Sequence, residues 1–153
     1  MNLEKQELFL QADQYLNRCI EAEKHALLYQ IDLSPELEIG PTFSQQLFSL
    51  IKKKGISETE CYKRANIDRR LFSKIRTDDE YQPKKITVFA LIFGLKLDFE
   101  EAKDLLDAAG YAFSHSMKMD ILVEFLIKKK VYDLPTVNEL LHKYGCPLLG
   151  MAE

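Results

Sequence analysis

The basic side chains in the middle of the sequence are best suited to contact nucleic acid. A guanidinium can donate two hydrogen bonds to the major-groove edge of guanine, and Arg69 and Arg70 start a predicted helix. Lysines and the remaining arginine would meet phosphates. A solvated helix face without a ligand is the alternative. The candidate contact residues are Arg69, Arg70, Ser73, Lys74 and Arg76, with Lys63, Lys84 and Lys85 beside them.

The distribution of charge along the chain supports this interpretation. The 153 residues carry a formal charge of −3, but residues 1–51 carry −5, residues 52–96 carry +6 and residues 97–153 carry −4. Counterions leave DNA only beneath the contacting face, so binding requires positive charge that is local. The same segregation of charge also suits a protein that binds an acidic partner.

No pattern in the sequence indicates catalysis, a metal site or a cofactor. The cysteines and histidines are scattered, without the spacing that places two ligands on one helical face. The acidic triplet 78–80, Asp78-Asp79-Glu80, lacks a partnering histidine, and glycine motifs that cradle phosphate are absent. We therefore expect a protein that is not an enzyme, with reduced structural cysteines. The scattered residues are Cys19, Cys61, Cys146, His25, His115 and His142.

The elements that position the basic residues are all expected to be helices. From Leu3 to Gln30 apolar residues recur at spacings of three and four, which predicts one long amphipathic helix. At 1.5 Å per residue it would span roughly 40 Å, long enough for a second chain to cover part of its apolar stripe. Packing on its own domain is the alternative. Residues 32–41 contain two prolines and a glycine, and they predict a linker.

Helix boundaries after the linker are clearly marked. A capping oxygen precedes a Glu or Gln by three residues at Thr42, Ser57 and Asp98, and Gly55 and Gly110 stand where helices should end. No segment shows the pattern of a strand. Helices are predicted at 43–54, 58–65, 69–76, 86–95, 99–109, 116–130 and 134–144.

Residues 58–76 have the pattern of two short helices joined by a tight turn. Asn66 is a residue type that tolerates positive φ in such a turn, and Asp68 is placed to cap the second helix. The basic residues would then lie on the outer side of that helix. The positions that the two helices and the turn must bury are Cys61, Ala65, Ile67, Phe72 and Ile75.

Over about residues 42–110 the sequence resembles the Cro/C1-type, XRE-like helix-turn-helix family of phage and bacterial repressors. In that family a module of five helices binds DNA, and its third helix is the recognition helix. The segment from Gly94 to Ala102 is similar to the junction between the last two helices. The residues that resemble the five helices in order are 43–54, 57–65, 68–76 and 84–107, the last range covering two helices.

Two residues depart from the family pattern. Tyr62 stands where a small residue, usually alanine, lets the two helices approach closely, and Asn66 stands where glycine is usual. The resemblance therefore leaves open how these helices cross. It covers less than half of the chain.

The C-terminal extension lies outside the resemblance. Its apolar residues give two helical faces, which predict a helical hairpin that packs on the module. Residues 128–130 are three lysines that either contact phosphate or suit the negative end of a helix. Residues 146–150 are apolar and mark core packing or a subunit contact. The predicted faces are Met117, Ile121, Leu122, Phe125 and Leu126, and Val137, Leu140, Leu141 and Tyr144.

The predicted fold is all-α, with a five-helix repressor-like helix-turn-helix module between an N-terminal long helix and a C-terminal helical hairpin. The predicted segments are an N-terminal amphipathic helix (1–31), the linker (32–41), the module (42–112) and the extension (113–153).

The resemblance implies a non-enzymatic, sequence-specific DNA-binding transcriptional regulator of bacterial or phage type. It would act as a dimer on double-stranded DNA, with the N-terminal helix or the C-terminal tail as the dimer contact, and without a cofactor. The alternative is a protein-interaction module, such as an adaptor or a phage-type inhibitor. No apolar run is long enough for a membrane span or a signal peptide, so we expect a cytoplasmic protein.

Overall fold

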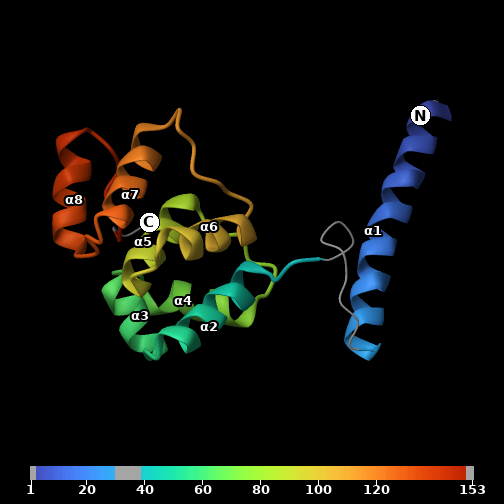
Figure 1. The fold of residues 1–153 in the computed structure, drawn as a ribbon, viewed down its shortest axis with the longest axis horizontal. Helices are drawn as coiled ribbons and strands as arrows, with labels where there is room; N and C mark the ends of the chain where they lie inside the picture. Colours follow the sequence, from blue (N-terminus) through green and yellow to red (C-terminus); the bar gives the residue numbers. More distant parts are fainter. Residues whose placement is uncertain (1–2, 30–38, 151–153) are drawn as a thin grey trace. The chain divides into compact units, whose positions relative to one another are not determined.

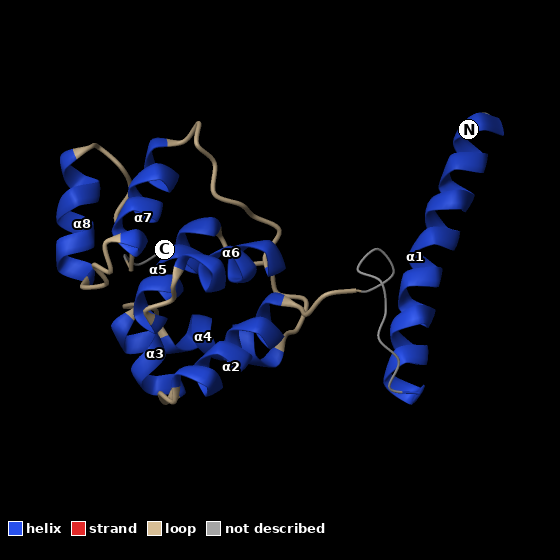
Figure 2. Ribbon diagram, in the orientation of Figure 1, coloured by secondary structure: helices blue, strands red, loops and turns tan. Residues whose placement is uncertain are grey.

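The computed structural model describes residues 3–29 and 39–150, and these residues form eight helices and no strand (Figures 1 and 2). The all-α prediction is therefore confirmed for them. Residues 32–38 of the predicted linker lie outside the described residues. The helices are α1 (Leu3–Tyr29), α2 (Phe43–Lys54), α3 (Glu58–Arg64), α4 (Arg69–Thr77), α5 (Lys85–Leu95), α6 (Phe99–Ala108), α7 (Lys118–Lys128) and α8 (Leu134–Lys143).

The chain divides into two compact units, Met1–Gly40 and Pro41–Glu153. The first contains α1, a helix of 27 residues that carries many charged side chains among its apolar ones. No described helix combines the length and the apolar character that a membrane span needs. The large apolar side chains that α1 leaves exposed are Leu3, Leu8, Phe9, Leu10, Tyr15 and Leu16.

The second unit is built around α5. Every residue from Thr87 to Leu95 is buried, and α5 contacts α2, α3 and α6. Gly94 of α5 lies close to α3, because a Cβ atom there would lie 3.0 Å from the Cβ of Ala65 and 3.1 Å from the carbonyl oxygen of Cys61. The absence of a side chain at Gly94 is therefore what lets α3 lie against α5.

The three predicted capping residues, Thr42, Ser57 and Asp98, all cap their helices, but only two of them form the complete capping box. Thr42 and Asp98 each form a complete capping box, in which side chain and backbone exchange hydrogen bonds with the residue three positions later. Ser57 caps α3 by accepting from the backbone N–H of Glu60. The carboxylate of Glu60 does not return this bond, because it pairs with Arg64 one turn later.

The hairpin of α7 and α8 exists, but its first apolar face is rotated from the predicted one. The buried residues of α7 include Val123, Leu126 and Ile127, whereas Met117, Ile121 and Phe125 are exposed. The predicted face was therefore wrong for these three exposed residues, and Tyr144 of the second predicted face is exposed as well. The spacing of α7 allows two adjacent faces, and contacts with α6 and α8 select between them.

The chain beyond α8 returns to the core. Leu149 is fully buried, and the Asn138 side chain holds its backbone through two hydrogen bonds, one donated to the carbonyl oxygen at 2.9 Å and one accepted from the N–H at 2.8 Å. This part of the apolar C-terminal segment thus packs within its own unit.

Candidate nucleic-acid interface

Local hydrogen bonds define the turn between α3 and α4. Asn66 has a φ of 52°, which is the left-handed conformation expected from the sequence. The carboxylate of Asp68 accepts a hydrogen bond of 3.0 Å from the backbone N–H of Arg70, so it caps α4. Both the turn residue and the cap are confirmed.

The inner side of α4 is anchored in the core. The buried Phe72 ring meets the rings of Phe48 and Tyr62 at centroid distances of 5.6 and 5.4 Å. The buried hydroxyl of Ser44 donates a hydrogen bond of 2.9 Å to the carbonyl oxygen of Ile75. These contacts fix the orientation of α4 and direct its other side outward. Of the residues predicted to be buried here, Cys61, Ala65, Phe72 and Ile75 are buried and Ile67 is half-buried.

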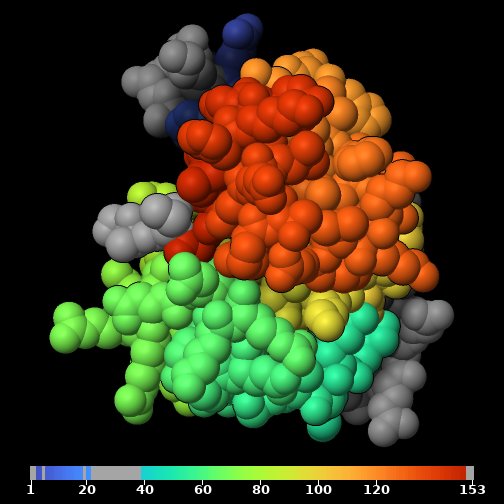
Figure 3. All heavy atoms as spheres, turned by 90° about the vertical axis from the view of Figure 1, so that its left-hand side faces the viewer, coloured from blue at the N-terminus to red at the C-terminus, as the bar shows by residue number. Residues whose placement is uncertain are grey.

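The outer side of α4 is exposed and positively charged. Arg69 and Arg70 form its first turn, and neither has an ion-pair partner in the part of the chain that the structure describes. Arg76 lies 3.4 Å from the carboxylate of Glu58, and the ammonium of Lys74 lies over an aromatic ring. In Figure 3, long side chains of the green segment that contains α3 and α4 stand out from the surface. Two unpaired guanidinium groups thus stand at the capped end of α4.

Lys85, another predicted contact residue, is engaged inside the fold. Its ammonium pairs at 2.5 Å with the carboxylate of Asp120, which is 1% exposed and also accepts the backbone N–H of Ser114 at 2.8 Å. Removing the lysine would leave a buried carboxylate without its counter-charge. Lys85 therefore links α5 to α7 through this ion pair, and the proposed interface does not include it. Of the other predicted contact residues, Lys63, Arg69, Arg70, Lys74, Arg76 and Lys84 are exposed and Ser73 is half-buried.

The two residues that depart from the repressor pattern both have structural partners. The ring of Tyr62 packs on Phe72, tilted by 42°. The amide of Asn66 donates a hydrogen bond of 2.6 Å to the carbonyl oxygen of Gly150, and a Cβ on Gly150 would lie 2.8 Å from the carbonyl oxygen of Ala65. The C-terminal residues therefore close over the turn that precedes α4. Sequence reasoning missed this contact, because it joins positions 84 residues apart and only the glycine gives a local signal.

Residues capable of acid–base or metal chemistry are dispersed over the described residues. Among these, no three His, Cys, Asp or Glu side chains are grouped so that they could hold a metal ion. Burial raises the pKa of the Cys61 thiol to about 12, so the unreactive thiol form dominates at neutral pH. The exposed Asp78 accepts the backbone N–H of Glu80 at 3.0 Å, which makes the acidic triplet a turn. His115 pairs with Glu124 at 3.0 Å.

Comparison with known proteins gives no relative for this chain. No protein-family model matches it, and neither a curated protein nor a solved structure is significantly similar to it. Its function must therefore be inferred from its own residues, and the exposed arginines of α4 are the feature with the most specific chemistry.

Proposed function

We propose that this protein is a sequence-specific DNA-binding transcriptional regulator of the Cro/C1 type, which acts without chemistry, and that α4 is its recognition helix. Helices α2 to α6 would form the five-helix module. The observation that carries the proposal is the exposure of Arg69 and Arg70, unpaired, at the capped start of a helix whose other side is fixed in the core. Major-groove readout requires donors at the N-terminal end of a rigid helix.

Each basic residue has a distinct role in this proposal. Arg69 and Arg70 donate to base edges, and Ser73 lies one turn later on the same side of α4. The phosphates are met by lysines and an arginine, which fix the register of the protein on the duplex without reading sequence. The phosphate-contacting residues are Lys63, Lys74, Arg76 and Lys84.

We further propose that α1 joins two copies into a dimer. Apolar residues recur along α1 at alternating spacings of four and three, which is the pattern of a coiled-coil seam. Leu8 and Tyr15 of this seam are 59% and 51% exposed. A dimer would present two recognition helices to half-sites about 34 Å apart. The seam positions are Leu8, Ala12, Tyr15, Cys19, Ala22, Ala26 and Tyr29.

Selection of duplexes from a random pool, followed by fluorescence anisotropy at several salt concentrations, tests the proposal. The best site should bind at least about 10³-fold more tightly than an unrelated duplex at the same salt concentration. The logarithm of the affinity should fall with the logarithm of the salt concentration by about 0.9 for each phosphate contacted. A pool that yields no preferred sequence would contradict the proposal.

A protein-interaction module is the second candidate, and the first compact unit favours it. Residues 1–40 carry a charge of −5, and α1 exposes Leu8, Phe9 and Leu16. An acidic helix with exposed apolar side chains suits a partner protein better than a phosphate backbone. A stoichiometric protein complex that survives nuclease digestion and requires α1 would favour this function. A complex that nuclease dissolves would favour DNA binding.

A further inference from the structure

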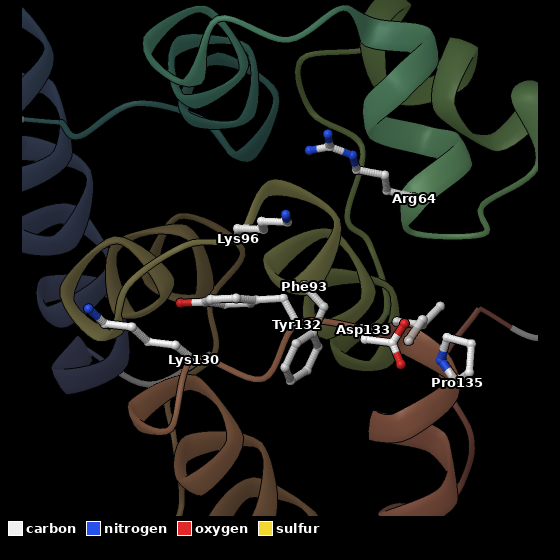
Figure 4. Close-up of a pocket in the computed structure, with 8 residues that line it drawn as sticks. Arg64, Phe93, Lys96, Lys130, Tyr132, Asp133 and Pro135 are labelled. Atoms are coloured by element: carbon white, nitrogen blue, oxygen red, sulfur yellow. The ribbon is translucent and has the colours of Figure 1, made fainter.

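A hollow of about 420 Å³ lies where the ends of α3, α5 and α7 meet the start of α8 (Figure 4). We propose that it binds the phosphate group of a small-molecule ligand. This proposal does not depend on the interface proposed above. The lining residues that carry the argument are Arg64, Phe93, Lys96, Lys130, Tyr132 and Asp133.

Three cations from three different elements share this hollow. Arg64 ends α3, Lys96 follows α5, and Lys130 lies just after α7. Figure 4 shows the guanidinium of Arg64 and the ammonium of Lys96 facing one another, whereas the ammonium of Lys130 points away from them. Arg64 pairs with Glu60, whereas Lys96 and Lys130 have no ion-pair partner among residues 3–29 and 39–150. Lys96 is therefore the unpaired cation that faces Arg64, and Lys130 would have to change rotamer to reach the same ligand.

The balance of charge selects the class of ligand. Among the residues that the structure describes, Asp133 is the one acidic residue of the lining. Its carboxylate is occupied, because it accepts hydrogen bonds from the hydroxyl of Thr136 at 2.5 Å and from the Thr136 backbone N–H at 3.0 Å. The lining residues together carry a formal charge of +2. A phosphate monoester carries about −1.5 to −2 at pH 7, so it matches this charge more closely than a carboxylate does.

The backbone holds both lysines at the hollow. Lys96 and Lys130 have φ values of 53° and 58°, a left-handed conformation in which glycine is usual after a helix. This conformation is strained for a residue with a side chain, and backbone strain of this kind is concentrated at binding sites. The sequence thus carries a lysine at two positions where glycine would fit the backbone better.

The aromatic floor of the hollow is also fixed. The hydroxyl of Tyr132 donates a hydrogen bond of 2.6 Å to the carbonyl oxygen of Leu97, and its ring meets the edge of the Phe93 ring at a centroid distance of 6.2 Å. A rigid floor reduces the entropy lost when a ligand binds.

Lys84, one of the proposed phosphate contacts, lies at the opposite end of α5 from the hollow. Lys84 immediately precedes this helix and Lys96 immediately follows it. The two lysines are twelve positions apart, so a rise of 1.5 Å per residue separates them by about 18 Å. Lys63, another proposed phosphate contact, precedes Arg64 of the lining, so a competition with DNA decides between the two sources of phosphate. We assign the phosphate group to a small molecule.

Nuclear magnetic resonance titration of the full chain with phenyl phosphate tests this assignment, with phenol as the control ligand and ionic strength held constant. Saturable shifts are expected at the amides of Lys96, Lys130 and Tyr132 with phenyl phosphate and not with phenol. Shifts that do not saturate, or that centre on another part of the chain, would overturn the site. This measurement on the unaltered protein decides the question even if a variant fails to fold.

A pair of matched variants sharpens the test. Lys96→Asn with Lys130→Asn removes two charges and keeps a residue type that adopts the left-handed conformation. It should weaken phenyl phosphate binding at least tenfold, whereas Lys118→Asn with Lys143→Asn, two exposed lysines that do not line the hollow, should leave it unchanged. Equal loss in both variants would overturn the proposal. If a short DNA duplex displaces phenyl phosphate, the ligand is a DNA phosphate and the small-molecule assignment is wrong.

Discussion

Glu101 is the charged residue whose contribution to stability can be worked out most fully. Its side chain is 10% exposed, and its carboxylate accepts hydrogen bonds from the ammonium groups of Lys53 and Lys54, each at 2.9 Å, and from the backbone N–H of Asp98 at 3.0 Å. Burial alone would raise its pKa, but these donors outweigh burial and lower the pKa to about 2. The carboxylate is therefore strongly favoured over the protonated acid in the folded protein.

The size of this effect follows from the shift in pKa. A change from 4.5 to about 2 corresponds to about 3 kcal/mol. We expect roughly 2 kcal/mol, because Lys53 is 67% exposed and its share is screened by solvent. Since the folded-state pKa is the lower one, this stability is fully present above pH 4.5 and is lost as the pH falls through the folded-state pKa.

Glu101→Gln tests this reasoning, because the amide oxygen can keep the bond to the Asp98 backbone while the charge is removed. Urea unfolding at pH 7 should show a loss of about 2 kcal/mol, and the gap to the unaltered protein should narrow by more than half between pH 7 and pH 3. Glu100→Gln, on an exposed neighbour, is the matched control and should change stability by less than about 0.5 kcal/mol. A Glu101→Gln loss that stays constant from pH 7 to pH 3 would refute the account.

Two further predictions concern the packing of α5 and the lysines at its start. Gly94→Ala places a methyl group 3.0 Å from Ala65, so it should destabilise the protein by about 1–3 kcal/mol in thermal unfolding, whereas Gly40→Ala, with open space around it, should be nearly neutral. Equal melting temperatures for the two variants would show that α3 and α5 are not closely packed. Lys85→Met should cost about 3–5 kcal/mol in urea unfolding, because it strands the buried carboxylate of Asp120. Lys84→Met should leave the protein folded. If DNA is the ligand, this change should weaken binding to every sequence alike and reduce the salt slope by about 1. Unfolding caused by Lys84→Met, with weaker DNA binding caused by Lys85→Met, would show that the roles of the two lysines are reversed.

The features of this fold that could be predicted from the sequence are those that neighbouring residues determine. Thr42 and Asp98 cap their helices through a partner three residues away, and Asn66 takes its left-handed conformation within a single turn. The buried positions of α3 and α4 follow from helical periodicity alone. Residue types and short spacings are therefore enough to predict these caps, this turn and these buried positions.

Features that depend on distant residues were not predicted. The pairing of Lys85 with Asp120 joins positions 35 residues apart, and nothing in the local sequence distinguishes Lys85 from its exposed neighbour Lys84. Lys96 and Lys130 have left-handed backbone conformations that are typical of glycine. Because lysine rarely adopts this conformation, the residue type did not predict the turns that these two residues form. The rotated face of α7 has the same origin, because tertiary contacts decide which of two apolar faces is buried.

The most direct measurement of the central claim is the affinity of the Arg69→Ala, Arg70→Ala double variant for the best duplex site, compared with Lys118→Ala, Lys143→Ala as a control that removes the same charge elsewhere. Both variants should stay folded, since each exposed position is worth less than about 0.5 kcal/mol. The arginine variant should lose about 1–3 kcal/mol of specific binding for each base contact removed, and the control should bind nearly as the unaltered protein does. A folded arginine variant that binds the site with unchanged affinity would contradict the assignment of α4 as the recognition helix and would favour the protein-interaction module.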